Sequence, residues 1–251
     1  MTNVVLTLSA GAVTGLVEAL AVDGEGGRIT VEERPLLRFG PPDDWEPLDR
    51  ALTALDRYRA VVLTSPRAAE AVTVRWTGRP RSHEPGRTEW WATGPATALP
   101  LGDSFGPVRM PPRHETRGRS AGESLARAVL AAGTGSPVLY PCGEVHRDEL
   151  GRRLSEAGIT VDEVTCYRAM LASLPEAREA VGRADILVVG SPRVAELVTA
   201  ACRADRRPRL LALGPTTAAA SRRNGWPPDA VAESPEAPEV ARQMRVLAVS
   251  Q

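Results

Sequence analysis

The sequence lacks the features that would point to a membrane or a nucleic acid. It contains no run of about 18 apolar residues, and its start has no basic segment followed by an apolar one, so we expect neither a membrane span nor a signal peptide. Its 31 basic and 31 acidic residues cancel, which gives no support to nucleic acid or a membrane surface as a partner. We expect a cytoplasmic protein and take it to be a monomer.

Cysteine and histidine are also scarce. The three cysteines are odd in number and widely spaced, which argues against a disulfide framework or a thiolate metal site and favours reduced, mostly buried thiols. The three histidines lack metal-ligand spacing and are expected to be solvent-exposed side chains. These residues are Cys142, Cys166, Cys202, His83, His114 and His146. The sequence therefore predicts no metal site.

Motifs for common cofactor and hydrolase sites are absent as well. Neither G-x-G-x-x-G nor a Walker sequence occurs, so a dinucleotide or P-loop site has no residues to form it. Ser65 and Ser191 each precede a proline, outside the G-x-S-x-G context of a serine hydrolase, and no histidine is placed to activate them. We therefore expect a protein that works without a cofactor.

The sequence does contain a repeated strand-turn-helix unit. Residues 209–220 place an apolar run before a glycine, a proline and an alanine-rich stretch, which predicts a strand, a tight turn and a helix. Residues 90–99 repeat this order. Upstream of each lies another matched pair, V-V-L-T-S-P-R within 61–72 and V-V-G-S-P-R within 186–198. The chain therefore holds two similar modules in the same internal order.

Strands alternate with helices along most of the chain, a pattern typical of parallel sheets covered on both faces. The part after about Asp185 supplies only three strands, too few for a doubly wound sheet unless the strands expected at 4–8 and 28–33 join it. We therefore infer a discontinuous first domain with a second domain inserted into it. The expected domains are residues 1–36 with 168–251, and residues 37–167.

Some local predictions bear on the site. Residues 137–140 form a predicted strand, followed by a turn at 141–143 and a helix at 144–157 with Val145, Leu150 and Leu154 on one side. Ser120, with Glu123 three residues later, predicts a capped helix start. Segments without regular structure are expected at 38–47, 77–88 and 111–119.

The expected helix N-termini carry small or hydroxyl-bearing residues that leave backbone N–H groups exposed. In open parallel sheets ligands bind beyond the carboxyl ends of the strands, where helix ends supply free donors and a dipole that favours anions. Several such ends facing one cleft suit a ligand with many carboxylates or phosphates. The alternative is that each Ser or Thr is only an N-cap. The residues concerned are Thr64, Ser65, Gly94, Ala96, Thr97, Cys142, Gly143, Ser191, Gly214, Thr216 and Thr217.

Two arginines stand at matched positions of the repeat, Arg67 and Arg193. Each follows an expected helix start, where a guanidinium can pair with a ligand carboxylate. The alternative is a solvated side chain on the first turn of the helix. We include both as candidates for substrate binding.

Six segments in this order resemble the uroporphyrinogen-III synthase family. They are T-S-P-R-A-A-E-A-V, G-P-A-T-A, V-L-Y-P-C-G-E-V-H-R-D-E-L, E-V-T-C-Y-R-A, G-S-P-R-V-A-E-L-V, and L-A-L-G-P-T-T-A-A-A followed by A-E-S-P. The resemblance runs over nearly the whole chain. It implies an α/β protein of two flavodoxin-like lobes with parallel sheets, the second inserted into the first. It also implies a two-strand linker, made of residues 159–167 and 35–39, and a substrate cleft between the lobes.

The resemblance further implies an activity, the cyclisation of linear hydroxymethylbilane to uroporphyrinogen III with loss of water and inversion of ring D through a spiro intermediate. The substrate is a reactive polycarboxylate, so the protein must mainly fold it and admit one proton donor. Tyr167 matches the family tyrosine proposed to protonate the leaving hydroxyl. Ser65, Thr97, Ser191 and Thr217 match ligand-contacting hydroxyls, and Arg147 completes the expected substrate site.

Two classes of function stay open from the sequence. One is the synthase, favoured by the presence of Tyr167, Thr97 and Thr217. The other is a non-catalytic tetrapyrrole- or anion-binding module built on the same lobes, because the turn at 9–11 replaces the Arg-Pro of many family members. A two-lobe solute-binding protein would need an export signal, which we do not find.

Overall fold

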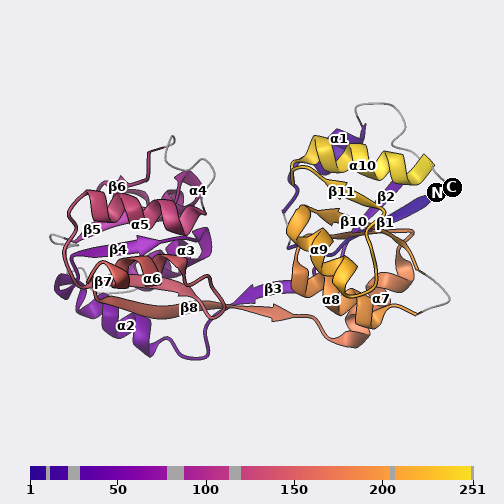
Figure 1. Ribbon diagram of the computed structural model, residues 1–251. Helices are drawn as coiled ribbons and strands as arrows, with labels where there is room; N and C mark the ends of the chain where they lie inside the picture. Colours follow the sequence, from indigo (N-terminus) through magenta and orange to yellow (C-terminus); the bar gives the residue numbers. More distant parts are fainter. Residues whose placement is uncertain (10–11, 22–28, 78–87, 113–119, 204–206, 250–251) are drawn as a thin grey trace. The chain divides into compact units, whose positions relative to one another are not determined.

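The computed structural model describes residues 1–9, 12–21, 29–77, 88–112, 120–203 and 207–249 (Figure 1). Residues 78–87 of the loop expected at 77–88 and residues 113–119 of the loop expected at 111–119, with His83 and His114, lie outside the described residues, and so do Ala10 and Gly11. The chain divides into two compact units, Met1–Arg38 with Met170–Gln251 (unit 1) and Phe39–Ala169 (unit 2). Sequence alone placed these two boundaries after residues 36 and 167.

Unit 1 is built on a five-stranded sheet in the order β11-β10-β9-β1-β2, and its recorded strand pairs are parallel. The strands are β1 Thr2–Leu6, β2 Ile29–Glu33, β9 Ile186–Val189, β10 Arg209–Leu213 and β11 Ala230–Ala232. The helices are α1 Leu16–Ala21, α7 Leu174–Arg183, α8 Pro192–Ala201, α9 Pro215–Arg223 and α10 Ala237–Val249. The first two strands of the chain therefore complete the C-terminal sheet, as the strand count predicted.

Each face of the unit 1 sheet has its own hydrophobic core, because parallel strands are buried on both sides. One core packs α7, α8 and α9 against the sheet through residues such as Ala180, Val198 and Ala218. The other packs α1 and α10 through residues such as Leu20 and Val240. The helices thus form two layers with the sheet between them.

Unit 2 contains a six-stranded sheet in the order β3-β8-β7-β4-β5-β6. The strands are β3 Leu37–Gly40, β4 Ala60–Leu63, β5 Glu89–Ala92, β6 Val108–Arg109, β7 Val138–Gly143 and β8 Val161–Leu171. The helices are α2 Glu46–Thr53, α3 Pro66–Thr77, α4 Pro95–Ala98, α5 Ala121–Ala131 and α6 Glu149–Glu156, with 3-10 turns at Leu55–Arg57 and Leu99–Phe105. The chain passes from unit 1 to unit 2 in β3 and returns in β8.

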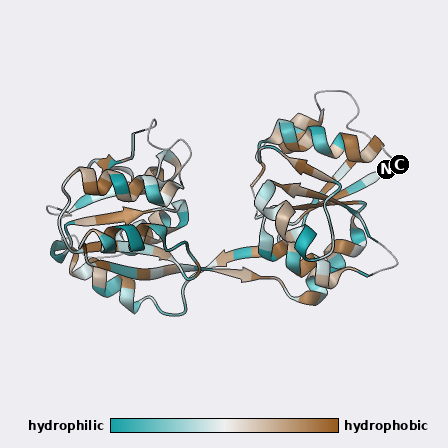
Figure 2. Cartoon of the chain, viewed as in Figure 1, coloured by the Kyte–Doolittle hydropathy of each residue, from teal (hydrophilic) through white to brown (hydrophobic). Residues whose placement is uncertain are grey.

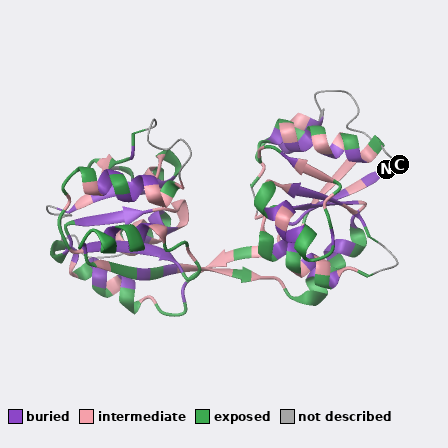
Figure 3. Cartoon of the chain, in the orientation of Figure 1, coloured by how far each residue is buried: buried purple, intermediate pink, exposed green. Residues whose placement is uncertain are grey.

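The unit 2 sheet is also covered on both faces. Leu52, Val72 and Phe105 belong to the core formed with α2, α3 and the second 3-10 turn. Leu125 and Leu154 belong to the core formed with α5 and α6. The central strand β4 is apolar and buried at every position, brown in Figure 2 and purple in Figure 3. In the described part of the chain, no helix is long and apolar enough to cross a membrane.

The strands of the two units lie in the same spatial order, but they follow one another along the chain in a different order. The repeated segments make β4 correspond to β9 and β5 to β10, and β6 then corresponds to β11. The next strands of unit 2, β7 and β8, occupy the places of β1 and β2. Counted along its own strands, unit 1 has the flavodoxin-like order 2-1-3-4-5. Unit 2 is a circular permutation of that order with β3 added at one edge.

The resemblance implied a linker strand at 35–39, whereas the prolines and glycine of 38–47 suggested no regular structure, and the second expectation was wrong for the first part of that segment. Leu37–Gly40 forms β3 beside β8. The strand ends just before Pro41 and Pro42, which have no N–H group to give to a strand ladder. The prolines therefore end the strand without preventing it.

The predicted turn at 141–143 was also wrong, because β7 continues through Pro141 to Gly143. The proline is tolerated because the recorded pairing of β7 with β4 stops at Leu139, and beyond it β7 pairs with β8. The next helix, α6, begins at Glu149 instead of residue 144. Val145 consequently lies in a loop and is 70% exposed, so it does not share one side of a helix with the buried Leu150 and Leu154.

Candidate active site

The strand order of unit 2 reverses between β4 and β7, which are neighbours in the sheet but far apart in the chain. In parallel sheets such a switch point opens a crevice beyond the carboxyl ends of the strands. Recorded pairing between β4 and β7 stops at Val61 and Leu139, before either strand ends. A pocket of about 260 Å³ lies at this end of the two strands.

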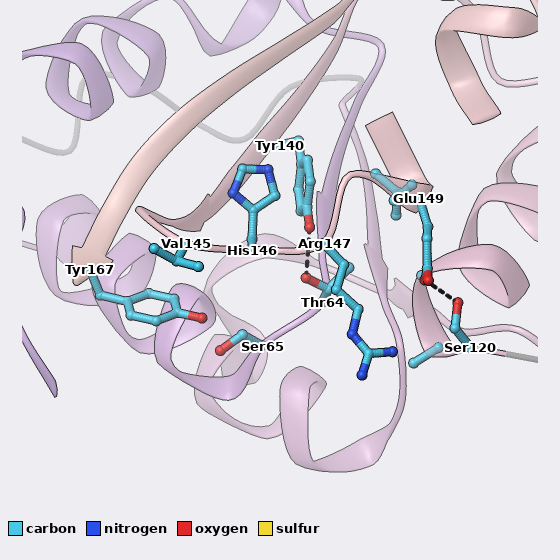
Figure 4. A pocket seen from close by; sticks show the side chains of 12 residues that line it. Thr64, Ser65, Ser120, Tyr140, Val145, His146, Arg147, Glu149 and Tyr167 are labelled. Atoms are coloured by element: carbon cyan, nitrogen blue, oxygen red, sulfur yellow. Dashed lines mark hydrogen bonds between the residues drawn. The ribbon is translucent and has the colours of Figure 1, made fainter. Parts of the chain in front are cut away.

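The pocket is formed by Tyr140 of β7, Tyr167 of β8, the segments that follow β4 and β7, and the first turns of α5 and α6 (Figure 4). Its lining residues are Thr64, Ser65, Ser120, Ala121, Gly122, Tyr140, Val145, His146, Arg147, Glu149, Leu150 and Tyr167. Four of the site residues expected from the sequence meet here, namely Thr64, Ser65, Arg147 and Tyr167. The switch point brings them together from three separate parts of the chain.

Tyr140 forms the buried part of the pocket wall. Its side chain is 1% exposed, and its hydroxyl lies 3.0 Å from the hydroxyl of Thr64. Burial raises the pKa of Tyr140 to about 12, so its phenol is neutral at physiological pH. One of the two hydroxyls donates and the other accepts, which fixes the orientation of the Thr64 side chain.

Tyr167 packs directly over the backbone of Gly143. A Cβ added to Gly143 would lie 2.7 Å from Cζ and 2.9 Å from the hydroxyl of Tyr167, so a side chain at this position would collide with the ring. The strand ladder is irregular here, and the N–H of Glu144 donates to the carbonyl of Tyr167 at 2.9 Å. Phe39 packs edge-on against the Tyr167 ring with centroids 6.0 Å apart. The Tyr167 hydroxyl points to the side of the pocket where Ser65 lies (Figure 4).

Ser65 and Arg67 lie beside this tyrosine at the start of α3. The backbone N–H of Arg67 donates to Ser65 Oγ at 3.2 Å, so Ser65 does cap the helix, as the alternative interpretation held. Accepting that bond leaves the Ser65 O–H available as a donor. The guanidinium of Arg67 stacks 3.6 Å above the Phe39 ring. Phe39 thus contacts both Arg67 and Tyr167.

His146 was expected to be a solvent-exposed side chain, and this was wrong. Its side chain is 23% exposed, lines the pocket and meets the Tyr140 ring edge-on with centroids 5.5 Å apart. Its Nδ1 lies 2.8 Å from the carbonyl oxygen of Gly143, and its Nε2 lies 3.2 Å from Oε2 of Glu163. The usable signal in the sequence was position, because His146 follows closely on a strand at the switch point.

The remaining polar groups of the pocket include one exposed guanidinium, that of Arg147. Glu149 is engaged, because its carboxylate accepts a hydrogen bond from the hydroxyl of Ser120. Ser120 in turn caps α5 by accepting from the N–H of Glu123 at 3.1 Å, which confirms the predicted helix start. The pocket therefore offers hydroxyls and a guanidinium, a set suited to carboxylates.

The other expected site residues of unit 2 do not line this pocket. Cys142 is 2% exposed and belongs to a hydrophobic core. Burial, and to a lesser extent the nearby Glu163, raises the pKa of its thiol to about 12. Thr97 is 4% exposed, and its hydroxyl lies 3.2 Å from that of Thr93. Gly94 is the N-cap of α4, and Ala96 is exposed in its first turn.

The remaining expected residues lie in unit 1, at the starts of α8 and α9. Ser191 is the N-cap of α8, and its side chain makes no capping hydrogen bond, unlike its counterpart in unit 2. Gly214, the N-cap of α9, has φ 93°, a conformation that favours glycine. Thr216 and Arg193 are exposed in the first turns of these helices, whereas Thr217 is 3% exposed.

The metal and cysteine predictions can be compared with the described residues. Among them, no group of three or more His, Cys, Asp or Glu side chains could hold a metal ion. Cys142 and Cys166 are free and buried, and Cys202 is free and partly buried. This agrees with the prediction of reduced, mostly buried thiols.

Comparisons with known proteins point to one family. The family model described as uroporphyrinogen-III synthase HemD matches residues 17–241. Uroporphyrinogen-III synthase from Synechococcus elongatus is 30% identical over 145 residues, which cover 57% of this chain and 53% of that protein. The chain therefore matches about half the length of this relative.

Two solved structures resemble the fold. A mutant uroporphyrinogen III synthase from Thermus thermophilus aligns with a TM-score of 0.58 and 17% identity over 100% of this chain and 99% of that chain. Uroporphyrinogen-III synthetase from Helicobacter pylori aligns with a TM-score of 0.58 and 17% identity over 98% of this chain and 99% of that chain. At this identity the likeness is one of fold. Because the family model covers most of the sequence, the chain belongs to the uroporphyrinogen-III synthase HemD family.

Proposed function

We propose that this protein is a uroporphyrinogen-III synthase that cyclises linear hydroxymethylbilane to uroporphyrinogen III, with loss of water and inversion of ring D through a spiro intermediate. The observation that carries the proposal is the pocket at the unit 2 switch point, in a chain of this family. There Tyr167 meets Thr64, Ser65 and Arg147. A proton donor beside carboxylate-binding groups is what this reaction requires.

Tyr167 is the proton donor in this proposal. The ring A hydroxyl leaves as water once it receives a proton, and the phenol of Tyr167 lies at the pocket where that group would be held. The phenolate regains a proton when the newly closed macrocycle loses one, so the step is balanced. A positioned general acid contributes roughly 10² to 10⁴ in rate.

The other site residues bind and fold the substrate. Arg147 and Arg67 pair with carboxylates, and Thr64 and Ser65 donate their hydroxyl protons. Cys142 has a buried side chain, so its contribution is through the backbone, whereas Thr97 contributes a hydroxyl that it shares with Thr93. Further contacts that we propose are Gly94, Ala96, Gly143, Ser191, Arg193, Gly214, Thr216 and Thr217.

The test is a product analysis. The protein is incubated with hydroxymethylbilane, the products are oxidised to porphyrins, and isomers I and III are separated. Closure without inversion of ring D gives isomer I, so an excess of isomer III over a protein-free control supports the proposal. The same isomer ratio with and without protein would leave a binding module that performs no catalysis.

We also propose that the protein acts as a monomer in the cytoplasm. Light scattering on the purified chain checks the first statement, with a mass of 26.8 kDa expected. Fractionation of the source cells checks the second.

A further inference from the structure

His146 lies between two groups that accept hydrogen bonds. Its Nδ1 is 2.8 Å from the carbonyl oxygen of Gly143, which can only accept, so Nδ1 carries a proton and donates it. Its Nε2 is 3.2 Å from Oε2 of Glu163. A neutral imidazole with its proton on Nδ1 has only a lone pair on Nε2, which would face a carboxylate oxygen. The contact is favourable only when a second proton lies between His146 and Glu163.

The carboxylate of Glu163 is held in place by α6, the helix that precedes it in the chain. A Cβ added to Gly151 would lie 2.0 Å from Oε1 of Glu163, so the carboxylate rests against the backbone of α6 where a side chain is missing. Gly151 is in the first turn of α6, which begins at Glu149. The N-terminus of a helix favours a negative charge. Glu163 therefore presents a carboxylate oxygen to His146 as the acceptor for the second proton.

The other partner of His146 links it to Tyr167. Gly143, whose carbonyl accepts from His146, is the residue over which the Tyr167 ring packs. The Tyr167 carbonyl also accepts from the N–H of Glu144, the next residue. A side chain that fixes the Gly143 peptide thereby fixes the surface on which the tyrosine rests.

We propose that His146 is a positioning residue for Tyr167, which it holds through Gly143 by means of a proton shared with Glu163. The proposal rests on the proposed function, because that function gives Tyr167 its role. His146 itself neither donates to nor accepts from the substrate in this scheme. When the shared proton is lost at higher pH, the His146 to Glu163 contact is lost, and the Gly143 peptide is held less firmly.

Other titratable and charged groups line the same pocket as the imidazole. Burial raises the pKa of Tyr140 on β7 to about 12, so its phenol is neutral between pH 6 and 9, and Tyr167 on β8 lines the same pocket. Arg147 in the same loop disfavours a positive charge on His146, whereas Glu149 on α6 favours it. Glu163 is the partner in direct contact.

The first experiment compares pH profiles of isomer III formation between pH 6 and 9, below the ordinary tyrosine range of about 10. In the unmodified protein we expect kcat to fall about tenfold on the alkaline side as the pair loses its proton. His146→Ala should have the low kcat throughout, with KM little changed. Glu163→Gln should keep a high kcat at every pH, because its amide N–H can donate to a neutral Nε2 and no second proton is needed.

A matched pair of glycine variants tests the contact between His146 and Glu163 without changing either of these two residues. Gly151→Ala would displace the Glu163 carboxylate, whereas Gly182→Ala in α7 has nothing within 4 Å of the added Cβ. Alanine favours a helix over glycine, so neither variant should lower the midpoint of thermal unfolding. We expect kcat to fall several-fold in Gly151→Ala and to stay unchanged in Gly182→Ala.

Nitrogen-15 NMR of the free protein gives a readout that needs no substrate. The His146 ring should carry protons on both nitrogens in the unmodified protein and on one nitrogen in Glu163→Gln at the same pH. The NMR result separates the positioning role of His146 from the synthase activity. If the proton is shared but no isomer III forms, only the proposed function is refuted. An identical alkaline fall in Glu163→Gln, or unchanged kcat in His146→Ala, would overturn the positioning role.

Discussion

Gly143→Ala is the sharpest test of the arrangement around Tyr167. The new Cβ would lie 2.7 Å from Cζ of the ring, whereas carbon atoms in contact are ordinarily about 3.5 Å apart, so the ring must move by roughly 1 Å. The backbone is no obstacle, because Gly143 has no positive φ and lies in a strand. A displacement of this size in a catalytic group can lower the rate about 10²-fold.

The assay for this variant is the rate of isomer III formation together with the midpoint of thermal unfolding. Overpacking costs about 1 to 3 kcal/mol in a core, and we expect the low end because Tyr167 is only partly buried and borders the pocket. The variant should therefore remain folded while losing about 10²-fold in rate. Gly182→Ala serves as the control, since its Cβ meets nothing within 4 Å.

A double variant decides whether the loss acts through Tyr167. In a Tyr167→Phe background the hydroxyl is already absent, so adding Gly143→Ala should cost little more. A full, additive loss in that background would show that Gly143 acts through some other group. A normal rate in Gly143→Ala would refute the reasoning outright, because the position of the ring would then not matter to the reaction.

Three further predictions can be checked independently. Tyr167→Phe should lower the rate of isomer III formation about 10²-fold without changing thermal unfolding; an unaltered rate would make Tyr167 structural. Thr217→Ala should lower kcat/KM about tenfold or more, since a hydrogen bond to a charged group contributes about 1.5 to 3 kcal/mol. Thr97→Ala should lower it less, because that hydroxyl is shared with a neighbouring threonine; equal activities would contradict this. Hydrogen bonds from Arg242, and to a lesser extent from Gln243, lower the pKa of Glu239 to about 2. The contact between Glu239 and Arg242 therefore stabilises the fold fully above about pH 4.5, and this stabilisation is lost as the pH falls towards 2. Arg242→Gln should therefore raise the pH midpoint of acid unfolding, and an unchanged midpoint would show the contact to be negligible.

Much of the fold follows from the order of elements in the sequence. The apolar runs of β9, β10 and β11 are flanked by glycine or proline turns, so the limits of these strands could be predicted closely. The repeat and the strand count then required the first two strands to join the C-terminal sheet. The prediction was less accurate at Pro141, where the proline suggested a turn. The strand accepts this proline because the recorded pairing of β7 with β4 has already ended at Leu139, and sequence alone does not show where such pairing ends.

The site was predictable in part for a similar reason. Thr64, Ser65 and Tyr167 were marked by motifs at the ends of expected strands, and the structure places them around one pocket. His146 was not marked, because its contact with Glu163 joins the loop after β7 to β8, and the sequence does not place these two segments side by side. Contacts of that kind follow from register, which composition and spacing do not fix.

The insertion of unit 2 into unit 1 sets the order in which the chain can fold. Asn3 on β1 meets Asp185, 182 residues away, and β1 lies between β2 and β9, so unit 1 cannot complete its sheet until β9 has been synthesised. Unit 2 is continuous and ends at Ala169, so it can fold earlier on the ribosome. Its folding also shortens the later search, because the N–H of Ala172 then lies near its partner, the carbonyl of Leu36, at 2.9 Å in the native fold. A nascent chain whose residues up to 169 have emerged from the ribosome would therefore carry a finished unit 2 and two N-terminal strands whose sheet partner β9 is still missing.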